Sequence, residues 1–258
     1  MGIYVKKAVW LLICKIKGII YIPIDIVRFL YGLIRLGSKK DKLFPIVGII
    51  PIIGNNRMEA GNIDRHYYLQ DIYMAQKVMK NQPSVHYDIG SRVDGFISHL
   101  LCNRVPVTMI DIRPLPISID GLSFIEGDAT DLSQFEDSSI ESLSTLHAVE
   151  HFGLSRYGDK ADAFASYKAM KAVQRVIKRG GFLYFSVPIS YRNGIIYNSH
   201  RVFKPTYILD QFSEMKLISF AYIHDYKVNE FLGDQAVEVI KQNHFNEYDC
   251  GMFVFEKK

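Results

Sequence analysis

Residues 84–95 read SVHYDIGSRVDG, and this stretch decides the fold class. Its first half, up to Ile89, is short and apolar enough to form a buried strand, and Gly90 follows where that strand ends. Glycine at a strand-to-helix turn lets the backbone approach a ligand closely. The helix start that follows offers free N–H groups to a carboxylate. The turn is incomplete as a dinucleotide fingerprint, because Arg92 stands where a second glycine is needed.

The alternation of strand and helix continues downstream. We expect strands at residues 84–89, 105–110, 122–125, 140–146, 182–187, 217–223 and 252–255, and helices at 62–80, 96–101, 160–178 and 205–212. Asn62 is expected to cap the first helix, and Gly180-Gly181 to end the third. This order predicts an α/β fold with a mostly parallel sheet covered on both faces. Because such sheets bind ligands beyond the carboxyl ends of their strands, the residues after each strand are the candidates.

Several strand ends carry suitable side chains. Asp111 follows the second strand, roughly twenty positions past the glycine turn, where a carboxylate can accept hydrogen bonds from both ribose hydroxyls. Asp128 follows the third strand, where a carboxylate can accept from an adenine amino group. For both, an ordinary turn aspartate is the alternative. His147, Glu150 and His151 follow the fourth strand, where they suit acid–base work or metal binding, the alternative being structural histidines.

Taken together, these stretches resemble the class I S-adenosylmethionine-dependent methyltransferase superfamily. The similar stretches, in chain order, are DIGSR (88–92), MIDIR (109–113), EGDA (126–129), SLSTLHAVEH (142–151) and VIKRGGFLYFSVP (176–188). No single stretch is specific, but all of them occur in the right order and spacing over residues 84–225. The stretches HYDIGSRVDGF, MIDIRPL, EHFGLSRYGD and NSHRVF are also similar to a bacterial subfamily found among cell-surface polysaccharide biosynthesis proteins. That second link is an association only.

The resemblance implies a Rossmann-like sheet of seven strands with helices on both faces and the final strand antiparallel at one edge. It implies S-adenosyl-L-methionine as the cofactor. The residues that it assigns to the cofactor are Asp88, Gly90, Ser91, Asp111, Ile112, Asp128, Ala129 and His147. The chain departs from the family at Arg92, where a second glycine is usual, and this concerns the methionine end of the cofactor.

Methyl transfer to a hydroxyl group benefits from a base, because the neutral oxygen is a poor nucleophile. His151 is the first candidate, since the loop after strand four faces the methyl group in this superfamily. The other catalytic candidates are Glu150, His147 and His200. The residues expected to contact the acceptor are Arg156, Tyr157, His200 and Arg201. We assign no metal, although the four catalytic candidates together would make a nitrogen-rich site for a zinc-like ion, which is an alternative.

The leading prediction is an enzyme that methylates an oxygen on a sugar of a cell-surface glycan or its precursor, either a small molecule or a lipid-linked glycan. The alternative is a catalytically silent methyltransferase fold that acts as a binding module in glycan assembly. A nucleotide-dependent oxidoreductase is disfavoured, because the GxGxxG fingerprint is incomplete.

Charge divides the 258 residues into two parts. Residues 1–42 hold nine Lys and Arg against two Asp, so a net charge of +4 for the whole chain leaves the remainder negative. A nucleic-acid partner is therefore not expected. We predict a basic, apolar, helical segment with a linker over residues 1–61 and a methyltransferase domain over 62–258. Residues 1–42 suit an anionic membrane surface, the alternative being packing on protein.

The three cysteines are widely spaced and odd in number, which indicates free thiols in a reducing compartment. We therefore expect a cytoplasmic protein, placed at the inner membrane face if the basic segment binds lipid.

Overall fold

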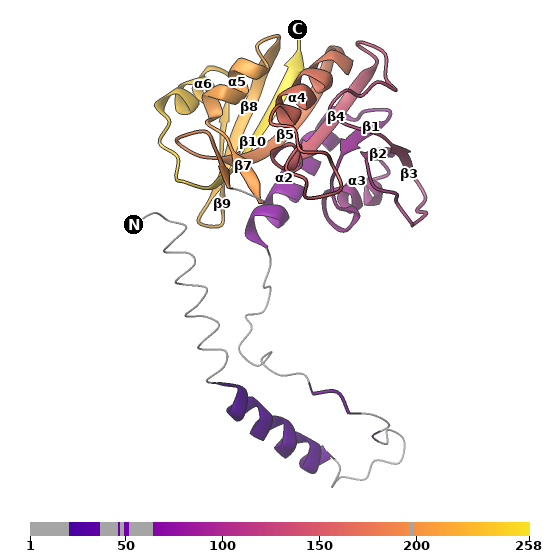
Figure 1. Ribbon diagram of the computed structural model, residues 1–258, viewed down its shortest axis with the longest axis vertical. Coiled ribbons are helices and arrows are strands. Elements are labelled where there is room, and N and C mark those ends of the chain that lie inside the picture. Colours follow the sequence, from indigo (N-terminus) through magenta and orange to yellow (C-terminus); the bar gives the residue numbers. More distant parts are fainter. Residues whose placement is uncertain (1–20, 37–45, 47–48, 52–63, 197–198) are drawn as a thin grey trace. The chain divides into compact units, whose positions relative to one another are not determined.

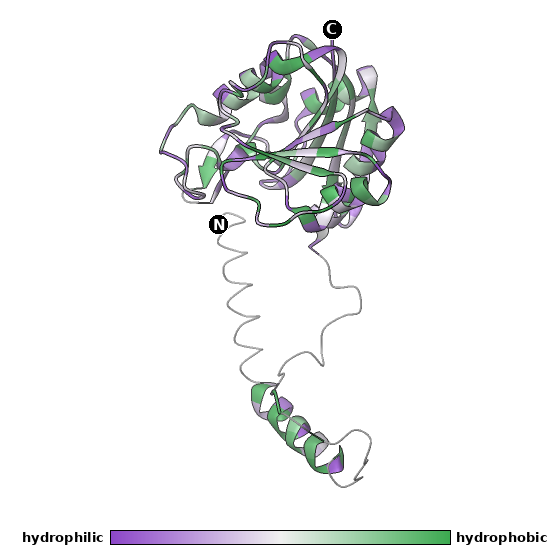
Figure 2. Cartoon of the chain, turned by 90° about the vertical axis from the view of Figure 1, so that its right-hand side faces the viewer, coloured by the Kyte–Doolittle hydropathy of each residue, from purple (hydrophilic) through white to green (hydrophobic). Residues whose placement is uncertain are grey.

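The computed structural model describes residues 21–36, 46, 49–51, 64–196 and 199–258 (Figure 1). The chain divides into two units, Met1–Ile63 and Asp64–Lys258. In the first unit, residues 21–36 are helical, and Figure 2 shows this helix as largely apolar. Across the described residues, no helix combines the length and the apolar character that a membrane crossing requires.

The second unit is built on an eight-stranded sheet in the order β3-β2-β1-β4-β5-β10-β8-β9. Its strands are β1 (His86–Ile89), β2 (Val107–Asp111), β3 (Leu122–Glu126), β4 (Ile140–Leu146), β5 (Ile177–Ile189), β8 (Met215–His224), β9 (Lys227–Leu232) and β10 (Asp249–Lys257). The strands β1 to β5 pair in parallel, whereas β10 runs antiparallel to both β5 and β8. The expected α/β fold with a mostly parallel sheet is confirmed.

The expected strand count and the expected place of the last strand are both wrong. The additional strand, β9, forms an antiparallel hairpin with β8 at the edge of the sheet. The last strand, β10, lies inside the sheet between β5 and β8. Met252 and Phe253 are adjacent residues of β10 and therefore point to opposite faces of the sheet, and both are fully buried. A strand with both faces buried belongs in the interior of a sheet rather than at its edge.

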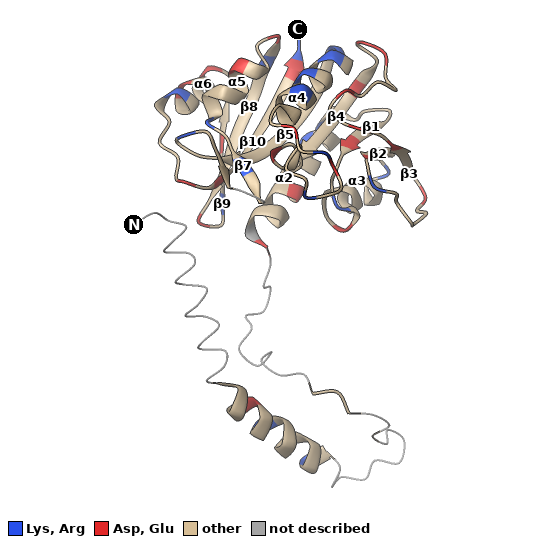
Figure 3. Cartoon of the chain, viewed as in Figure 1, with Lys and Arg blue, Asp and Glu red and all other residues tan. Residues whose placement is uncertain are grey.

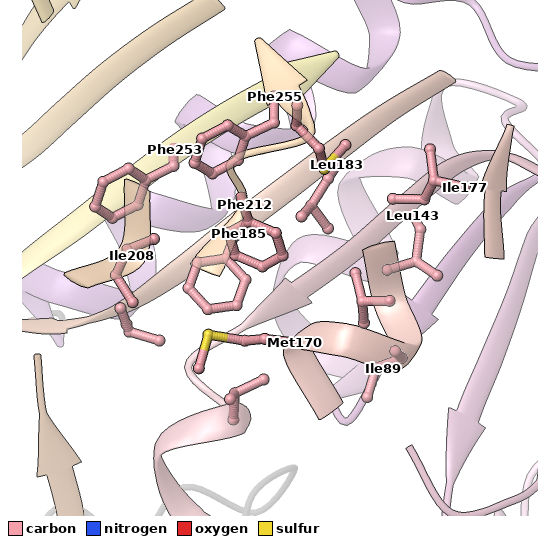
Figure 4. Close-up of a cluster of buried hydrophobic side chains, with 14 of the residues drawn as sticks. Ile89, Leu143, Met170, Ile177, Leu183, Phe185, Ile208, Phe212, Phe253 and Phe255 are labelled. Atoms are coloured by element: carbon pink, nitrogen blue, oxygen red, sulfur yellow. The ribbon is translucent and has the colours of Figure 1, made fainter. Parts of the chain in front are cut away.

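Helices cover both faces of the sheet. One face is covered by α4 (Ala165–Val176), α5 (Pro205–Gln211) and α6 (Gly233–Gln242), and the other by α2 (Arg65–Asn81), η2 (Val93–Ile97) and α3 (Ser98–Cys102). Leu183 and Phe185 of β5 face the first group, where the ring of Phe185 contacts those of Phe212 and Phe253 (Figure 4). Tyr184 faces the second group. This alternation gives the sheet one core on each side.

Helix α2 is capped by a residue that the sequence pattern did not select. The carboxylate of Asp64 accepts a hydrogen bond from the backbone N–H of Tyr67 at 3.3 Å, and the helix runs from Arg65 to Asn81. Asn62, the expected cap, lies outside the described residues. Asp and Asn cap helices in the same way, so the composition of this stretch did not distinguish them.

The glycine pair Gly180-Gly181 does not end a helix. Helix α4 begins at Ala165 rather than near Lys160 and gives way directly to β5, which runs through both glycines. Gly180 has a φ of +71°, and a Cβ on Gly181 would lie 2.9 Å from the carbonyl oxygen of Glu141. The pairing of β4 with β5 is irregular at this point. The glycines therefore allow an irregularity in the pairing of β4 with β5, where the two backbones approach closely.

The segment after β1 begins its helix earlier than expected, with a π-helical turn. Gly95 within this turn has non-helical dihedral angles, φ −122° and ψ −112°. A Cβ at Gly95 would lie 2.2 Å from Oδ2 of Asp71. The turn therefore requires glycine, because the carboxylate of Asp71 on α2 packs against the backbone of Gly95.

Candidate active site

The candidate site lies where the strand order reverses. From β1 the chain adds β2 and β3 on one side, and from β4 it adds β5 on the other, so the switch point lies between β1 and β4. The sequence-predicted residues Gly90, Asp111 and His147 stand at or directly after the ends of β1, β2 and β4, and Asp128 stands two positions beyond β3. Because these strands are parallel, all of these ends lie at one edge of the sheet, where ligands bind in such folds.

The turn after β1 contacts the loop after β4. Gly90 has a φ of +75°, and a Cβ there would lie 3.0 Å from the Cβ of Ala148. A side chain at this position would therefore be strained by its φ and crowded by the neighbouring loop. Because glycine has no side chain, the two loops can approach each other closely at the switch point.

Asp88, the residue two positions before Gly90, stabilises this turn through hydrogen bonds. Its fully buried carboxylate accepts hydrogen bonds from the backbone N–H of Ser91 at 3.1 Å, from Oγ of Ser91 at 2.9 Å and from Oγ of Ser144. Burial raises the pKa of Asp88 to about 6, although these hydrogen bonds oppose the rise. The predicted cofactor residues Asp88 and Ser91 thus contact each other and shape the turn of Gly90.

Arg92, the departure from the family pattern, turns outward. Its guanidinium pairs with the carboxylate of Asp94 at 3.0 and 2.6 Å, and both side chains are strongly exposed. The backbone of the Gly90 turn is therefore formed without the arginine side chain lying across it.

Asp111 is paired within its own loop. Its carboxylate accepts from the backbone N–H of Arg113 at 2.9 Å and from the Nε and Nη2 of the same residue at 2.9 and 2.7 Å. Ile112 between them is exposed. A ribose at this position would share the carboxylate with Arg113 or displace the guanidinium from it.

The loop after β3 is a tight turn. Asp128 is exposed, and its carboxylate accepts from the backbone N–H of Thr130 at 2.8 Å, while Ala129 beside it is buried. This is the turn role that was the alternative for Asp128. It leaves the second carboxylate oxygen able to accept from a ligand.

The loop after β4 places a buried cation at the strand end. His147 has a φ of +51°, with Nδ1 2.9 Å from Oε1 of Glu150 and Nε2 3.3 Å from Sγ of Cys250. Burial alone would lower the pKa of His147, but the Glu150 carboxylate and the Cys250 side chain together raise it to about 10. His147 is thus held as an imidazolium that donates to both neighbours.

Glu150 has one oxygen in use and one oxygen available. Oε1 lies between the two histidines, 2.9 Å from Nδ1 of His147 and 3.8 Å from Nε2 of His151. Oε2 is buried and has no hydrogen-bond partner in the described part of the chain. A buried carboxylate oxygen without a partner is costly, so this atom suits a donor group supplied by a ligand.

His151 has its tautomer fixed by the backbone. Nδ1 lies 2.7 Å from the carbonyl oxygen of Ser199, which can only accept, so Nδ1 carries the proton. In the neutral ring, the lone pair is then on Nε2, on the side of Glu150. Burial lowers the pKa of His151, the nearby Glu150 carboxylate opposing this. The ring is therefore neutral near pH 7 and suited to accept a proton.

His200 lies on β7 (His200–Val202), which forms a small hairpin with β6 (Gly194–Ile196) that the sequence did not predict. Its Nδ1 lies 2.8 Å from Oγ of Ser199, and its ring meets that of Tyr248 edge-on at 5.3 Å. Nε2 is buried and has no partner among the described residues. Burial lowers the pKa of His200, so this ring is neutral near pH 7 as well.

The three residues expected to contact the acceptor, apart from His200, have different surroundings. Arg156 and Tyr157 are exposed next to His151, whose ring lies 5.4 Å from that of Tyr157. Arg201 is buried and donates to the carbonyl oxygen of Phe152 at 2.5 Å. Its guanidinium supports the loop backbone from inside, and its expected contact with the acceptor stays a prediction.

A metal site does not form from the predicted ligands. No group of three or more His, Cys, Asp or Glu side chains within the described ranges is arranged to hold a metal ion. Both ring nitrogens of His147 already contact protein groups, and Nδ1 of His151 contacts a carbonyl oxygen. The nitrogen-rich alternative is therefore unsupported.

Residues 120–251, just over half of the chain, match the family described as "Caenorhabditis protein of unknown function, DUF268". The chain belongs to the DUF268 family. The match includes the loop after β4, the β6–β7 hairpin and Cys250, but not Gly90 or Asp111. It gives no support to the bacterial polysaccharide subfamily. No curated protein matches the sequence.

Solved structures show which fold this DUF268 chain has. A [4+2]-cyclase, SpnF, is 12% identical with a TM-score of 0.51, over 73% of this chain and 80% of its own. The Burkholderia thailandensis 1,6-didemethyltoxoflavin-N1-methyltransferase, solved with S-adenosylhomocysteine, is 10% identical with a TM-score of 0.52, over 74% and 79%. The N-methyltransferase NodS of Bradyrhizobium japonicum, also solved with S-adenosylhomocysteine, is 13% identical with a TM-score of 0.50, over 78% and 91%. The fold is that of class I methyltransferases.

Sequence reasoning missed several residues of the site in this DUF268 chain. Tyr67 of α2 meets the ring of His147 edge-on at 5.6 Å, and burial together with the Glu150 charge raises its pKa to about 12. Cys250, Tyr248 and Ser199 come from distant parts of the chain. None of them follows one of the first four strands, so only knowledge of where β10 and the hairpin lie would have identified them.

Proposed function

We propose that the chain is an S-adenosylmethionine-dependent methyltransferase that acts on a hydroxyl group. The observation that carries this proposal is the fixed tautomer of His151, which puts a neutral, proton-accepting Nε2 at the strand-end edge of a class I methyltransferase fold. Two structures with this fold contain S-adenosylhomocysteine. The proposed base follows β4 and the expected cofactor turn follows β1, and these two strands are adjacent in the sheet.

The residues at the switch point fit such a cofactor. Gly90 lets the turn after β1 lie against the loop after β4, and the buried Asp88 holds that turn in place. Asp111 would accept hydrogen bonds from the ribose hydroxyls, and the free oxygen of Asp128 from the adenine amino group. Ser91, Ile112, Ala129 and His147 complete the predicted set. When bound, the cofactor supplies an electrophilic methyl group on a sulfonium.

We assign the proton transfer to His151. Nε2 takes the proton of the acceptor hydroxyl as the oxygen bonds to the methyl carbon and the carbon–sulfur bond breaks, leaving a methyl ether and S-adenosylhomocysteine. The imidazolium so formed faces Oε1 of Glu150 at 3.8 Å, whose charge stabilises it. The proton then leaves to solvent. Accurate alignment of the acceptor accounts for most of the remaining acceleration.

Glu150 and His147 act as positioning residues in this proposal. The imidazolium of His147 holds Oε1, so Oε2 keeps a fixed direction. Oε2 and the unpartnered Nε2 of His200 are buried atoms that a polar acceptor would satisfy. Their presence supports an acceptor with several hydroxyl groups.

As the acceptor we propose a sugar hydroxyl in a cell-surface glycan or its precursor, free or lipid-linked. Oε2 of Glu150 and Nε2 of His200, buried without a partner among the described residues, suit the hydroxyls of a sugar. Tyr157, exposed beside His151, is a proposed contact for the acceptor. Arg156, His200 and Arg201 are the further acceptor residues that we propose.

We further propose that residues 1–42 lie on an anionic membrane surface, which would place the protein at the cytoplasmic face. In the described helix, Asp25, Arg28 and Arg35 fall on one side at helical spacing (Figure 3). Asp25 is buried and pairs with Arg28 at 3.7 Å, and most of the exposed side chains of the helix are apolar. Such a helix suits the plane of a lipid interface. Co-sedimentation with vesicles that contain phosphatidylserine tests this, and loss of binding on deleting residues 1–42 is expected. Equal binding without them would favour packing on protein as their role.

A second candidate function is a catalytically silent binding module. One observation favours it: Arg113 already pairs with the carboxylate of Asp111, the residue expected to bind the ribose. The two proposals differ in turnover, because only an enzyme transfers the methyl group.

The experiment is calorimetric titration of the full chain with S-adenosylmethionine and S-adenosylhomocysteine. We expect micromolar binding that weakens at least about tenfold in Asp111→Ala. Asp137→Ala is the control, because Asp137 also pairs with an arginine, Arg175, but precedes β4 at the opposite end of that strand. Absence of binding by folded wild-type protein would contradict the methyltransferase proposal. Binding without methyl transfer to any hydroxyl acceptor would favour the silent module.

A further inference from the structure

The carbonyl oxygen of Ser199 brings two side chains of the β4 loop together. Nδ1 of His151 lies 2.7 Å from it and Nη1 of Arg156 lies 2.9 Å from it, and these two nitrogens are 3.4 Å apart. Because a carbonyl oxygen only accepts, both side chains donate to it. The guanidinium is thereby held beside the imidazole.

The loop that carries Arg156 is anchored at both ends. The carboxylate of Asp159 accepts from the backbone N–H groups of Gly153 at 2.6 Å and Tyr157 at 3.1 Å. The buried Arg201 holds the carbonyl oxygen of Phe152 from the other side. These contacts fix the backbone of the loop, and the backbone in turn restricts where the guanidinium of Arg156 can lie.

Tyr157 lies against two guanidinium groups. The Cζ atoms of Arg156 and Arg113 lie 5.0 and 4.9 Å from the centre of its ring. Attraction between a cation and an aromatic face restricts both groups. The charge of Arg113 is met by Asp111, whereas Arg156 has no carboxylate within ion-pair distance in the described ranges 64–196 and 199–258.

Two carboxylates of the same loop already have partners. Oε1 of Glu150 pairs with the imidazolium of His147, and the carboxylate of Asp159 binds backbone N–H groups. The protein therefore places an unmatched, oriented cation directly beside the imidazole that we propose as the base. Guanidinium groups bind phosphate and carboxylate well, because their paired N–H donors fit two oxygens at once.

We infer that the acceptor carries a phosphate or carboxylate group close to the hydroxyl that is methylated, and that Arg156 binds this anion. The inference rests on the proposed function for its hydroxyl, but the anion site itself does not depend on methyl transfer. Tyr157 orients the guanidinium, and Ser199 sets its distance from His151. The anion and the reacting hydroxyl must then be near neighbours in the acceptor, as they are in a sugar phosphate or a hydroxy acid.

The test uses the full chain labelled with ¹⁵N and ¹³C, titrated with inorganic phosphate or with acetate at constant ionic strength. The side-chain signal of Arg156 and the ring signals of His151 are followed by NMR. We expect a saturable shift of the Arg156 signal, with affinity at least about tenfold weaker in Arg156→Gln, as judged from the His151 signals. The pKa of His151 should also rise when the anion binds, because bound negative charge offsets the guanidinium. A stronger response to phosphate or to acetate distinguishes the two kinds of anion.

Arg179→Gln is the matched control, because Arg179 is an exposed arginine near the start of β5, away from the strand ends that form the site. It should bind phosphate like the wild type. No saturable shift with either anion, or equal binding in Arg156→Gln, would overturn the inference. Loss of phosphate binding in the presence of saturating S-adenosylhomocysteine would also overturn it, since Arg156 would then serve the cofactor carboxylate. Anion binding by a protein that does not bind S-adenosylhomocysteine would keep the anion site and reject the methyltransferase proposal.

Discussion

Nδ1 of His151 lies 2.7 Å from the carbonyl oxygen of Ser199, across 48 positions of sequence. This one contact decides which ring nitrogen is protonated and which can accept a proton. Without it, either nitrogen of a neutral histidine could carry the hydrogen. Ser199 precedes the β7 strand, so the hairpin after β5 determines the chemistry available in the loop after β4.

Replacement of His151 should separate chemistry from binding. We expect His151→Gln to lower kcat by about 10²- to 10⁴-fold and to leave the affinity for S-adenosylhomocysteine unchanged. The wild-type kcat/KM should rise with pH through a value below 6.5, because burial lowers the pKa of this base. Steady-state kinetics and calorimetry measure these effects. His244→Gln, an exposed histidine, is the control; a similar loss there, or wild-type turnover in His151→Gln, would exclude His151 as the base.

Gly90 should be sensitive to alanine for two reasons, and Gly180 for only one. Both have φ near +70°, at +75° and +71°, but only Gly90 has a neighbour in the way, the Cβ of Ala148 at 3.0 Å. We expect Gly180→Ala to cost about 1 kcal/mol of stability and Gly90→Ala to cost about 1–2 kcal/mol more. Gly90→Ala should also weaken binding of S-adenosylhomocysteine. Urea unfolding and calorimetry test this, and equal effects of the two substitutions would show that the two loops do not meet as described.

The buried pair of Glu150 and His147 should make stability fall in mild alkali. The folded-state pKa of His147, about 10, lies above its usual 6.5. Its contribution is therefore fully present below pH 6.5 and is lost as pH rises through about 10. The difference in unfolding free energy between wild type and Glu150→Gln should shrink over this range, by on the order of 1 kcal/mol per pH unit. A difference that does not vary with pH would mean that His147 is neutral.

His86 should make the free energy of unfolding fall in acid, whereas His147 makes it fall in alkali. Its ring is fully buried between the hydroxyls of Ser142 and Ser144 at 2.7 and 2.8 Å, and burial lowers its pKa from 6.5 to about 3. Its contribution is present above pH 6.5 and is lost as pH falls through about 3. Asp88, whose pKa is raised to about 6, changes stability in the opposite direction.

The difference between wild type and His86→Gln isolates the histidine, since Asp88 is present in both proteins. We expect the wild type to lose stability relative to the variant as pH falls from 6.5 towards 3, by up to about 1.4 kcal/mol per pH unit. Chemical unfolding at several pH values measures this. Parallel curves for the two proteins would mean that the imidazole is charged in the folded state.

Local pattern predicted the strand-end side of the site. Short apolar runs identified β1, β2, β3 and β4, and a parallel sheet obliges their carboxyl ends to share an edge. Gly90, Asp111, Asp128 and His147 could therefore be chosen from the sequence. The same local rules failed at Gly180-Gly181, because a glycine pair reads as a helix stop whether it ends a helix or allows two strands to approach.

The sequence by itself determined the α/β class and the candidates after each early strand, because burial alternation and turn residues act over a few neighbouring positions. Only the tertiary structure decided what those candidates touch. Cys250 reaches His147 across 103 positions because β10 inserts beside β5, and Ser199 reaches His151 because the β6–β7 hairpin comes back to the site. The state of each histidine depends on burial and on partners that the fold brings together, and no local pattern encodes those partners.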